Sequence, residues 1–304
     1  MFKEIFKFEL KYRIGRPATW AYFGILLLYG LLLGSLGESY SSEKTLANSP
    51  YSITQTMVTL SVFGMLIASA VMGVPLYRDI EHKVKNYFFS YPITEKSYLL
   101  GRYAGSMVIL LMISLGLHLG MIVGYATGPL WGVEDADKFG PLNLLHYLNP
   151  TLLFYWPNFI LFGTLFFALV AFTKRVTVTY VASILAFIAW LLGNALTQDI
   201  ENRTLVDLLD PFAFRTYENI TRYFTPVEQN TLLTSLEGNL LWNRLIWIGV
   251  AFTVFLITYY RFDFQKFLDK KLGKSKKKGS EESVKPDFSK LIPAGVKNFS
   301  TGIY

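Results

Sequence analysis

The sequence predicts an all-α membrane protein that crosses the bilayer six times. Of its 304 residues, 52% are hydrophobic and only 17% are charged, whereas soluble domains carry about 25% charged residues. The charges are also unevenly placed, because long apolar stretches contain none. A helix needs roughly 20 apolar residues to cross a bilayer core. The six predicted spans cover approximately residues 18–37, 53–76, 103–126, 151–173, 176–197 and 241–260.

The character of these stretches excludes several other classes. Strands of a membrane barrel show about 10 residues of alternating polarity, whereas runs such as GILLLYGLLLGSL are continuous. The chain has no cysteine, which excludes disulfides, thiolate metal sites and cysteine nucleophiles.

The sixth span has the shortest charge-free stretch, residues 245–260, and extends outward through residues 240–242. We expect Arg244 to reach the lipid headgroups there with its long side chain.

The basic residues predict the orientation of the chain. Most of the 29 lysines and arginines precede span one, lie between spans two and three, join spans four and five, or follow span six. Basic residues favour the cytoplasmic side of a membrane, so both termini are expected in the cytoplasm. The largest outer loop, residues 198–238, carries apolar residues at helical spacing, which predicts short helices at the outer surface.

The first sixteen residues predict an amphipathic helix that lies on the inner leaflet. Lys3, Lys7 and Lys11 form a stripe at every fourth position. Pro17 is expected to break this helix before the first span. The alternative is an ordinary charged leader. The predicted apolar face consists mostly of Phe2, Ile5, Phe6 and Leu10.

The segment RDIEHKVKNYFFSYPITEKSYLLGRY, residues 78–103, lies between spans two and three. Residues 77–91 predict a short cytoplasmic helix, because apolar residues recur there at helical spacing, and Pro92 ends it. Thr94 is expected to cap the next helix. This element is either an inner-leaflet loop or a docking element for a soluble partner. The apolar face would carry Ile80, Val84, Tyr87, Phe88 and Tyr91, and the polar face Asp79, Glu81, His82, Lys83, Lys85 and Asn86.

Span three contains four glycines that share one helical face. Such a face allows a neighbouring helix to approach closely. That neighbour belongs either to the same bundle or to a second six-span unit. The glycines are Gly116, Gly120, Gly124 and Gly128.

Three polar residues inside the spans are candidates for a substrate pathway. His118 is ionisable, and ionisable residues within a membrane are often functional. The alternative is a neutral histidine that bonds a nearby carbonyl or Ser114. Asn158 and Asn194 are the other candidates. Spans one to five contain no charged residue, which disfavours an ion-coupled carrier and favours an ATP-driven machine.

The order of these elements resembles the ABC-2 type permeases. The phrase SYPITEKSYLLGRY carries the family's Pro-[Ile/Val]-[Ser/Thr] pattern at residues 92–94 and its Gly-[Lys/Arg] pattern at Gly101 and Arg102. Glu81, or Asp79, stands at the acidic position that opens the segment. The sequence LDPFAF in the last outer loop is also similar to the family. The resemblance covers residues 1 to about 262.

The resemblance implies a specific assembly. Permeases of this family pair two six-span units, here in a bacterial inner membrane, and each unit presents a coupling helix to a cytoplasmic ATP-binding cassette subunit. The second unit is either another copy or the second half of a longer chain, and membrane lipids surround the spans. The residues implied to couple the ATPase are Arg78, Asp79, Glu81, Lys85, Tyr87, Phe88, Pro92, Gly101 and Arg102.

The start FKFELKYRIGRPATW and the basic tail or linker, residues 263–304, also resemble the first part of a bacterial permease joined to an M1-family zinc aminopeptidase. No HExxH motif is present, and His82, His118 and His146 lie far apart. We therefore expect no metal site, cofactor or catalytic residue in this chain. The chain also lacks the phosphate loop GxxxxGK[ST], so ATP hydrolysis is expected in a partner subunit. No nucleic-acid partner is expected.

Two other functions are alternatives to a permease. A membrane-embedded enzyme would need clustered acids or histidines near one interface. The outer loop supplies one such group, Asp199, Glu201, Asp207 and Asp210. A scaffold of a multi-protein machine would bind partners without stimulating ATP turnover.

Overall fold

The computed structural model describes residues 1–37, 44–82, 93–197 and 202–263. The chain divides into two units, Met1–Asp269 and Lys270–Tyr304. The second unit lies outside the described residues, as does the predicted basic tail from residue 264 onward. Every regular element among the described residues is a helix, and six of these helices are long and apolar enough to cross a membrane. The predicted all-α, multi-pass fold is therefore confirmed.

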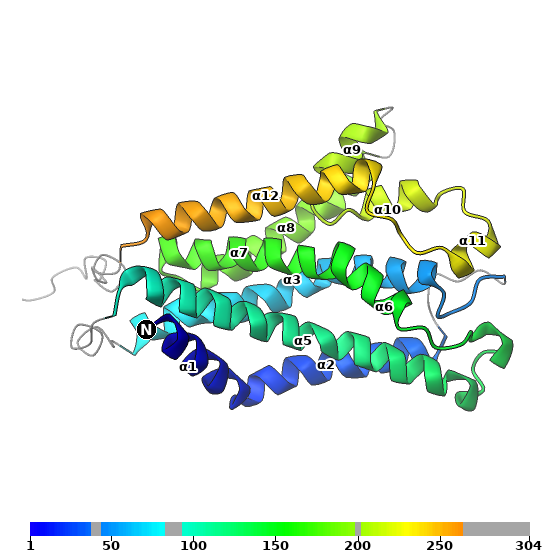
Figure 1. Ribbon diagram of the computed structural model, residues 1–304, viewed down its shortest axis with the longest axis horizontal. Helices are drawn as coiled ribbons and strands as arrows, with labels where there is room; N and C mark the ends of the chain where they lie inside the picture. Colours follow the sequence, from blue (N-terminus) through cyan, green and yellow to red (C-terminus); the bar gives the residue numbers. More distant parts are fainter. Residues whose placement is uncertain (38–43, 83–92, 198–201, 264–304) are drawn as a thin grey trace, which may run out of the picture. The chain divides into compact units, whose positions relative to one another are not determined.

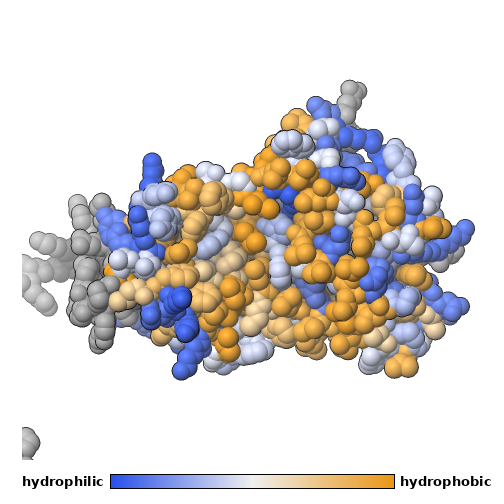
Figure 2. All heavy atoms as spheres, in the orientation of Figure 1, coloured by the Kyte–Doolittle hydropathy of each residue, from blue (hydrophilic) through white to orange (hydrophobic). Residues whose placement is uncertain are grey.

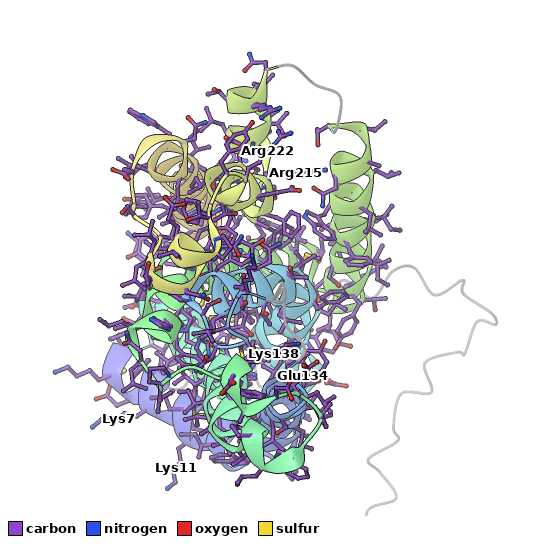
Figure 3. All side chains as sticks on the ribbon, turned by 90° about the vertical axis from the view of Figure 1, so that its right-hand side faces the viewer. Lys7, Lys11, Glu134, Lys138, Arg215 and Arg222 are labelled. Atoms are coloured by element: carbon purple, nitrogen blue, oxygen red, sulfur yellow. The ribbon has the colours of Figure 1, made fainter. Side chains whose placement is uncertain are left out.

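Two helices open the chain and meet at a proline. Helix α1 (Phe2–Ile14) ends just before Pro17, and α2 (Pro17–Ser35) begins at it. This break was predicted, because proline is tolerated in the first turn of a helix and not in its interior. Figure 3 shows Lys7 and Lys11 of α1 pointing away from the bundle.

Helices α3 (Pro50–Glu81) and α5 (Glu95–Trp131) are the longest elements. Each begins with a side-chain cap, since Ser49 accepts from the Ser52 N–H and Thr94 accepts from the Ser97 N–H. The predicted cap at Thr94 is thus confirmed. At 1.5 Å per residue the 32 residues of α3 extend about 48 Å. That length exceeds a bilayer core of about 30 Å, so the helix projects beyond it.

Three further helical stretches complete the six spans. Helix α6 (Leu145–Pro150), the π-helical turn η2 (Thr151–Tyr155) and α7 (Trp156–Thr173) follow one another without a break. Helix α8 (Thr177–Leu196) comes next. Helix α12 (Gly238–Arg261) begins before the predicted start of span six at residue 241.

Short helices occupy the connections between the spans. A 3-10 turn, η1 (Ala136–Lys138), follows α5. Between α8 and α12 lie α9 (Arg203–Leu209), α10 (Phe214–Thr221) and α11 (Pro226–Thr231). These three confirm the prediction of short helices within residues 198–238.

The connections gather at two opposite ends of the bundle (Figure 1). One end, here called the α1 end, contains α1, the last turn of α3, the first turn of α5 and the last turn of α12. The other, called the loop end, contains α6, α9, α10 and α11. Apolar side chains cover the middle of the face in Figure 2, and hydrophilic ones gather toward both ends. This distribution is typical of helices that cross a bilayer.

Helix α3 lies at the centre and packs against α5, α7 and α8. In the most apolar windows, 61% of the residues are buried in α3 and in α5, against 22% in α2 and in α12 and 11% in α8. The side chains of α2, α8 and α12 therefore point largely outward. Such extended apolar faces need lipid or another apolar surface to cover them.

The glycine face of α5 packs against α2 of the same chain. A Cβ atom added at Gly116 would lie 2.5 Å from the carbonyl oxygen of Phe23, and one at Gly124 would lie 2.5 Å from that of Leu31. The two backbones are too close for any side chain. The interpretation that this face meets a second six-span unit is therefore wrong. Gly120 also contacts the α2 backbone, whereas Gly128 lies against the ring of Phe139.

Candidate functional site at the α1 end

Glu9 lies at the centre of a buried group of arginines. Its side chain is 0% exposed. Its Oε1 accepts a hydrogen bond from Arg13 Nε at 2.7 Å, and its Oε2 accepts one from Arg78 Nη2 at 2.8 Å. Arg102 Nη1 also donates to Oε2. One carboxylate from α1 thus binds arginines from α1, α3 and α5.

A second carboxylate, Asp79, completes the network. Its Oδ2 accepts from Arg102 Nη2 at 2.7 Å and from the Tyr98 hydroxyl at 2.7 Å. Its Oδ1 lies 3.8 Å from Arg78 Nε. Arg102 therefore bridges the two carboxylates. We call this network the Glu9 cluster, and it consists of Glu9, Arg13, Arg78, Asp79, Tyr98 and Arg102.

Further contacts fix the arginines of the Glu9 cluster. Arg13 Nη2 donates to the carbonyl oxygen of Val71 at 2.9 Å. The Arg78 guanidinium lies over the ring of Tyr12, 4.0 Å from its centroid, an arrangement that attracts a cation to an aromatic face. The Glu9 cluster thereby joins α1, α3 and α5 into one unit.

The electrostatics of the Glu9 cluster keep Glu9 ionised. Burial acts to raise the pKa of Glu9, but the positive charges of Arg102, Arg13 and Arg78 outweigh it and lower the pKa to about 2. A buried charge is costly unless it is paired and hydrogen-bonded. Each carboxylate of the Glu9 cluster has arginine partners, whereas loss of Glu9 would leave its arginines without most of their compensation.

Small residues of α5 let α1 approach. A Cβ atom added at Gly101 would lie 2.8 Å from Ile5 Cγ2, and one at Gly105 would lie 2.8 Å from Glu9 Cβ. These glycines therefore form a groove on α5 that receives α1. Gly101, implied by the family resemblance to couple the ATPase, is a packing residue beneath α1 in this structure.

Several residues expected to face an ATPase are instead buried. Arg78, Asp79 and Arg102 are 7%, 4% and 3% exposed, so none presents its charge to a partner at the surface. The expectation that Asp79 lies on an exposed polar face is wrong, because Arg102 and Tyr98 bind its carboxylate inside the bundle.

The predicted helix at residues 77–91 also differs from the structure. Residues 77–81 continue α3 without a break and do not begin a separate helix. Ile80 is buried as expected, and Glu81 and His82 are exposed. The remaining predicted coupling residues, Lys85, Tyr87, Phe88 and Pro92, lie outside the described residues.

Sequence reasoning missed Glu9, although a signal was present. Glu9 follows Ile5 by one helical turn and therefore falls on the apolar face of α1, opposite the lysine stripe. An acid on an apolar face needs a buried partner. The position of Glu9 therefore predicts that a basic side chain binds it, but does not identify that side chain.

His118 is bonded within the bundle. Its Nδ1 lies 3.1 Å from the carbonyl oxygen of Ser114, and its Nε2 lies 2.5 Å from Thr151 Oγ1. The ring also packs edge-on against Tyr155, with 5.2 Å between centroids. These contacts match the expected histidine that bonds a nearby carbonyl.

Asn158 contacts a different part of the bundle. Its Oδ1 accepts from Arg244 Nη1 at 2.9 Å, and its Nδ2 donates to the Phe212 carbonyl at 3.1 Å. Arg244 was expected to reach the headgroups, but it is only 4% exposed. It also donates to Asn243 and to the Pro211 carbonyl. The loop that carries LDPFAF folds over Arg244 and buries it.

Asn194 binds the same outer loop from α8. Its Oδ1 accepts from Arg215 Nε at 3.0 Å. Asn158 and Asn194 therefore hold the segment around Phe212, and neither bonds His118. The structure does not bring the three predicted pathway residues together.

The acids of the outer loop have structural partners. Asp207 accepts from the side-chain amides of Asn219 and Asn239, at 2.5 and 2.8 Å. Asp210 accepts from the backbone N–H groups of Phe212 and Arg215, at 3.0 and 2.8 Å. Asp199 and Glu201 lie outside the described residues.

Within the part of the chain that the structure describes, no group of three or more histidines, aspartates or glutamates is arranged to hold a metal ion.

No model of a known protein family matches the chain, and no curated protein matches it. The functional proposal therefore depends on the geometry of the α1 end and on the order of the elements.

Proposed function

We propose that this chain is the membrane-spanning permease component of an ABC-2 type transporter. It moves a substrate across the bacterial inner membrane with energy from a separate ATPase subunit. The α1 end faces the cytoplasm, and the segment between α3 and α5 contacts the ATPase. A second six-span unit, from another copy or from a longer chain, completes the transporter.

One observation carries this proposal: the Glu9 cluster holds both ends of the segment between α3 and α5. Arg78 and Asp79 lie in the last turn of α3, whereas Tyr98 and Arg102 lie in the first two turns of α5. Glu9 ties both helices to α1. A displacement of the intervening segment is therefore transmitted to three helices together, as rigid-body gating of a transporter requires.

The outward faces of the bundle support the pairing with a second unit. Helices α2, α8 and α12 present apolar side chains away from the core. A membrane covers such faces with lipid, and helix association in a bilayer covers part of them with another unit. The glycine face of α5 is already occupied by α2, so the second unit would contact other helices.

The proposal is tested by purifying the chain from native membranes in a gentle detergent and measuring ATPase activity in the eluate. The wild-type chain is expected to co-elute with an ATP-binding cassette subunit. Tyr87→Asp and Glu81→Ala are expected to lose that subunit while still inserting in the membrane, because both alter the proposed contact segment. The matched control is Tyr223→Asp, since Tyr223 is 80% exposed near the loop end.

Three results would contradict the proposal. Elution of the wild-type chain without any ATPase would favour the scaffold or the membrane-embedded enzyme. Full ATPase recovery with both Tyr87→Asp and Glu81→Ala would show that the segment is not the contact. A partner whose ATP turnover does not respond to the chain would also favour the scaffold.

A further inference from the structure

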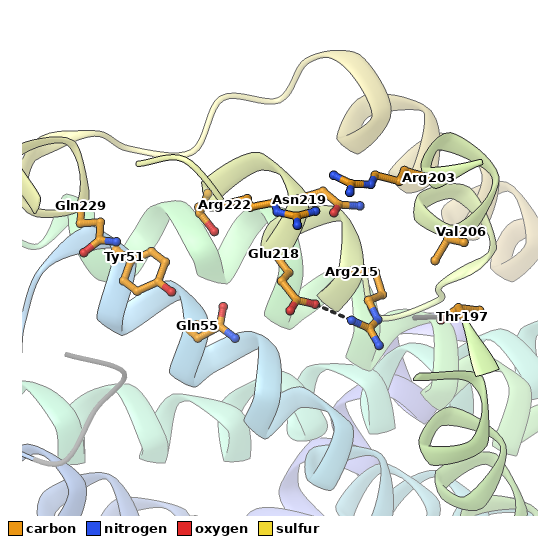
Figure 4. Close-up of a pocket in the computed structure, with 11 residues that line it drawn as sticks. Tyr51, Gln55, Thr197, Arg203, Val206, Arg215, Glu218, Asn219, Arg222 and Gln229 are labelled. Carbon is orange, nitrogen blue, oxygen red and sulfur yellow. Dashed lines mark hydrogen bonds and ion pairs between the residues drawn. The ribbon is translucent and has the colours of Figure 1, made fainter. Parts of the chain in front are cut away.

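A polar cavity of about 620 Å³ lies at the loop end. Its walls come from the start of α3, the end of α8, and the short helices α9 and α10 (Figure 4). Arg203, Arg215 and Arg222 line it, together with one acid, Glu218. The cavity therefore carries an excess of positive charge.

Two of these arginines form no ion pair with a carboxylate among the described residues. Arg215 pairs with Glu218 at 2.8 Å and donates to Asn194. By contrast, no described acid forms an ion pair with Arg203 or Arg222, and both side chains are exposed. Asp207 interacts with Arg203 electrostatically but does not form an ion pair with it. Arginines without an ion-paired acid around a concave surface attract anions, since a guanidinium binds phosphate or carboxylate oxygens in pairs.

An apolar cavity of about 410 Å³ adjoins the polar one. The two share Thr197, Val206 and Arg215 as lining residues. Phe162 and Trp190 contribute large apolar surfaces to the second cavity. The buried indole N–H of Trp190 has no hydrogen-bond partner among the described residues, so an acceptor on a bound molecule would satisfy it.

The apolar surface continues as a groove between α7, α8 and α12. This groove has a volume of about 400 Å³ and shares Phe162 and Ala186 with the apolar cavity. From Thr197 to Ala182, α8 rises about 22 Å at 1.5 Å per residue. One leaflet of a bilayer core is roughly 15 Å deep, so the groove is long enough for an acyl chain.

We infer that these three connected cavities form a binding site for an anionic amphiphile, such as a phospholipid with net negative charge. Its headgroup lies among Arg203, Arg215 and Arg222, and its acyl chain follows the apolar cavity and groove. A water-soluble anion would leave the apolar part unused. A neutral lipid would leave Arg203 and Arg222 unpaired. The inference is independent of the ATPase proposal, because it concerns binding alone.

Trp190 supplies a reporter for this site. The purified chain is placed in phosphatidylcholine nanodiscs of two kinds. One kind contains a fixed small fraction of brominated phosphatidylglycerol, and the other contains the same fraction of brominated phosphatidylcholine. Bromine quenches tryptophan fluorescence on contact, and subtraction of a Trp190→Phe variant isolates the signal of Trp190. We expect brominated phosphatidylglycerol to quench Trp190 far more than brominated phosphatidylcholine does.

Variants of the lining residues test whether the preference for phosphatidylglycerol comes from these cavities. Arg203→Gln combined with Arg222→Gln is expected to weaken phosphatidylglycerol binding about 25-fold, since each basic side chain near anionic lipid contributes about fivefold. Arg261→Gln is the control, because Arg261 is exposed at the α1 end. Ala186→Phe is expected to abolish quenching by either lipid at Trp190, because the new ring fills the junction of the cavity and groove.

Three outcomes would overturn the inference. Equal quenching of wild-type Trp190 by both lipids would show a general lipid contact. An unchanged preference in the Arg203→Gln, Arg222→Gln variant would show that the arginines do not bind the headgroup. Displacement of brominated phosphatidylglycerol by glycerol 3-phosphate at equal concentration would show a site for free anions. Thermal unfolding of each variant confirms that a lost signal does not reflect a lost fold.

Discussion

Replacing Glu9 by glutamine is expected to lower the free energy of unfolding by about 3–5 kcal/mol, the cost of leaving a buried charge without its partner. Arg13, Arg78 and Arg102 all bind this carboxylate, and an amide cannot compensate their charge. Unfolding of the purified chain in mixed micelles, titrated with denaturing detergent and followed by tryptophan fluorescence, measures the change.

Glu4→Gln is the matched control for Glu9→Gln. Both residues lie on α1, but the Glu4 side chain is 74% exposed and pairs with the N-terminal amine. Exposed ion pairs contribute little to stability, so Glu4→Gln should leave the unfolding curve unchanged. Equal stability of the Glu9→Gln variant and the wild type would contradict the assignment of Glu9 as the centre of the Glu9 cluster.

Replacing Gly120 by alanine is expected to destabilise the chain by about 1–3 kcal/mol, because overpacking forces neighbouring atoms to move. The added Cβ would clash with the Leu27 carbonyl oxygen and lie 2.8 Å from Leu31 N. Both atoms belong to the α2 backbone, which cannot shift as a side chain can. The same unfolding titration measures the effect.

Gly24→Ala on the facing helix α2 serves as the control. A Cβ at Gly24 meets nothing within 4 Å, and alanine favours a helix by up to about 1 kcal/mol over glycine. This variant should be as stable as the wild type or slightly more stable. If Gly120→Ala behaves like Gly24→Ala, the close packing of α2 on α5 is absent in the membrane.

The spans were predictable because each depends on local composition. Hydropathy identified the six helices, Pro17 identified the break between α1 and α2, and Thr94 identified the start of α5. These features depend on a few neighbouring residues, so they can be recognised in a single sequence. The predicted ends of α3 and α5 were less accurate, because both helices continue beyond the apolar core.

The partners within the Glu9 cluster were not predictable, because they are distant in sequence. Glu9 binds Arg78 and Arg102 across separations of 69 and 93 residues. Placing Glu9 on the apolar face of α1 requires only helical geometry, but selecting its partners requires the packing of three helices. The position of Arg244 was predicted wrongly for the same reason, because its partners Asn158 on α7 and Pro211 in the outer loop are also distant in sequence.

The orientation of the bundle decides whether the proposed coupling is possible, because an ATPase can act only on the cytoplasmic face. The cysteine-free chain allows single cysteines to report it. His82→Cys and Arg175→Cys place one thiol near the end of α3 and another between α7 and α8. Asp137→Cys and Val227→Cys place thiols in η1 and α11, near the loop end.

Labelling of intact cells with a membrane-impermeant maleimide decides the orientation. We expect cysteines at positions 137 and 227 to be labelled directly, whereas those at 82 and 175 are labelled only after the membrane is permeabilised. The reverse pattern would place the α3–α5 segment outside the cell, beyond the reach of ATP, and would contradict the proposed coupling.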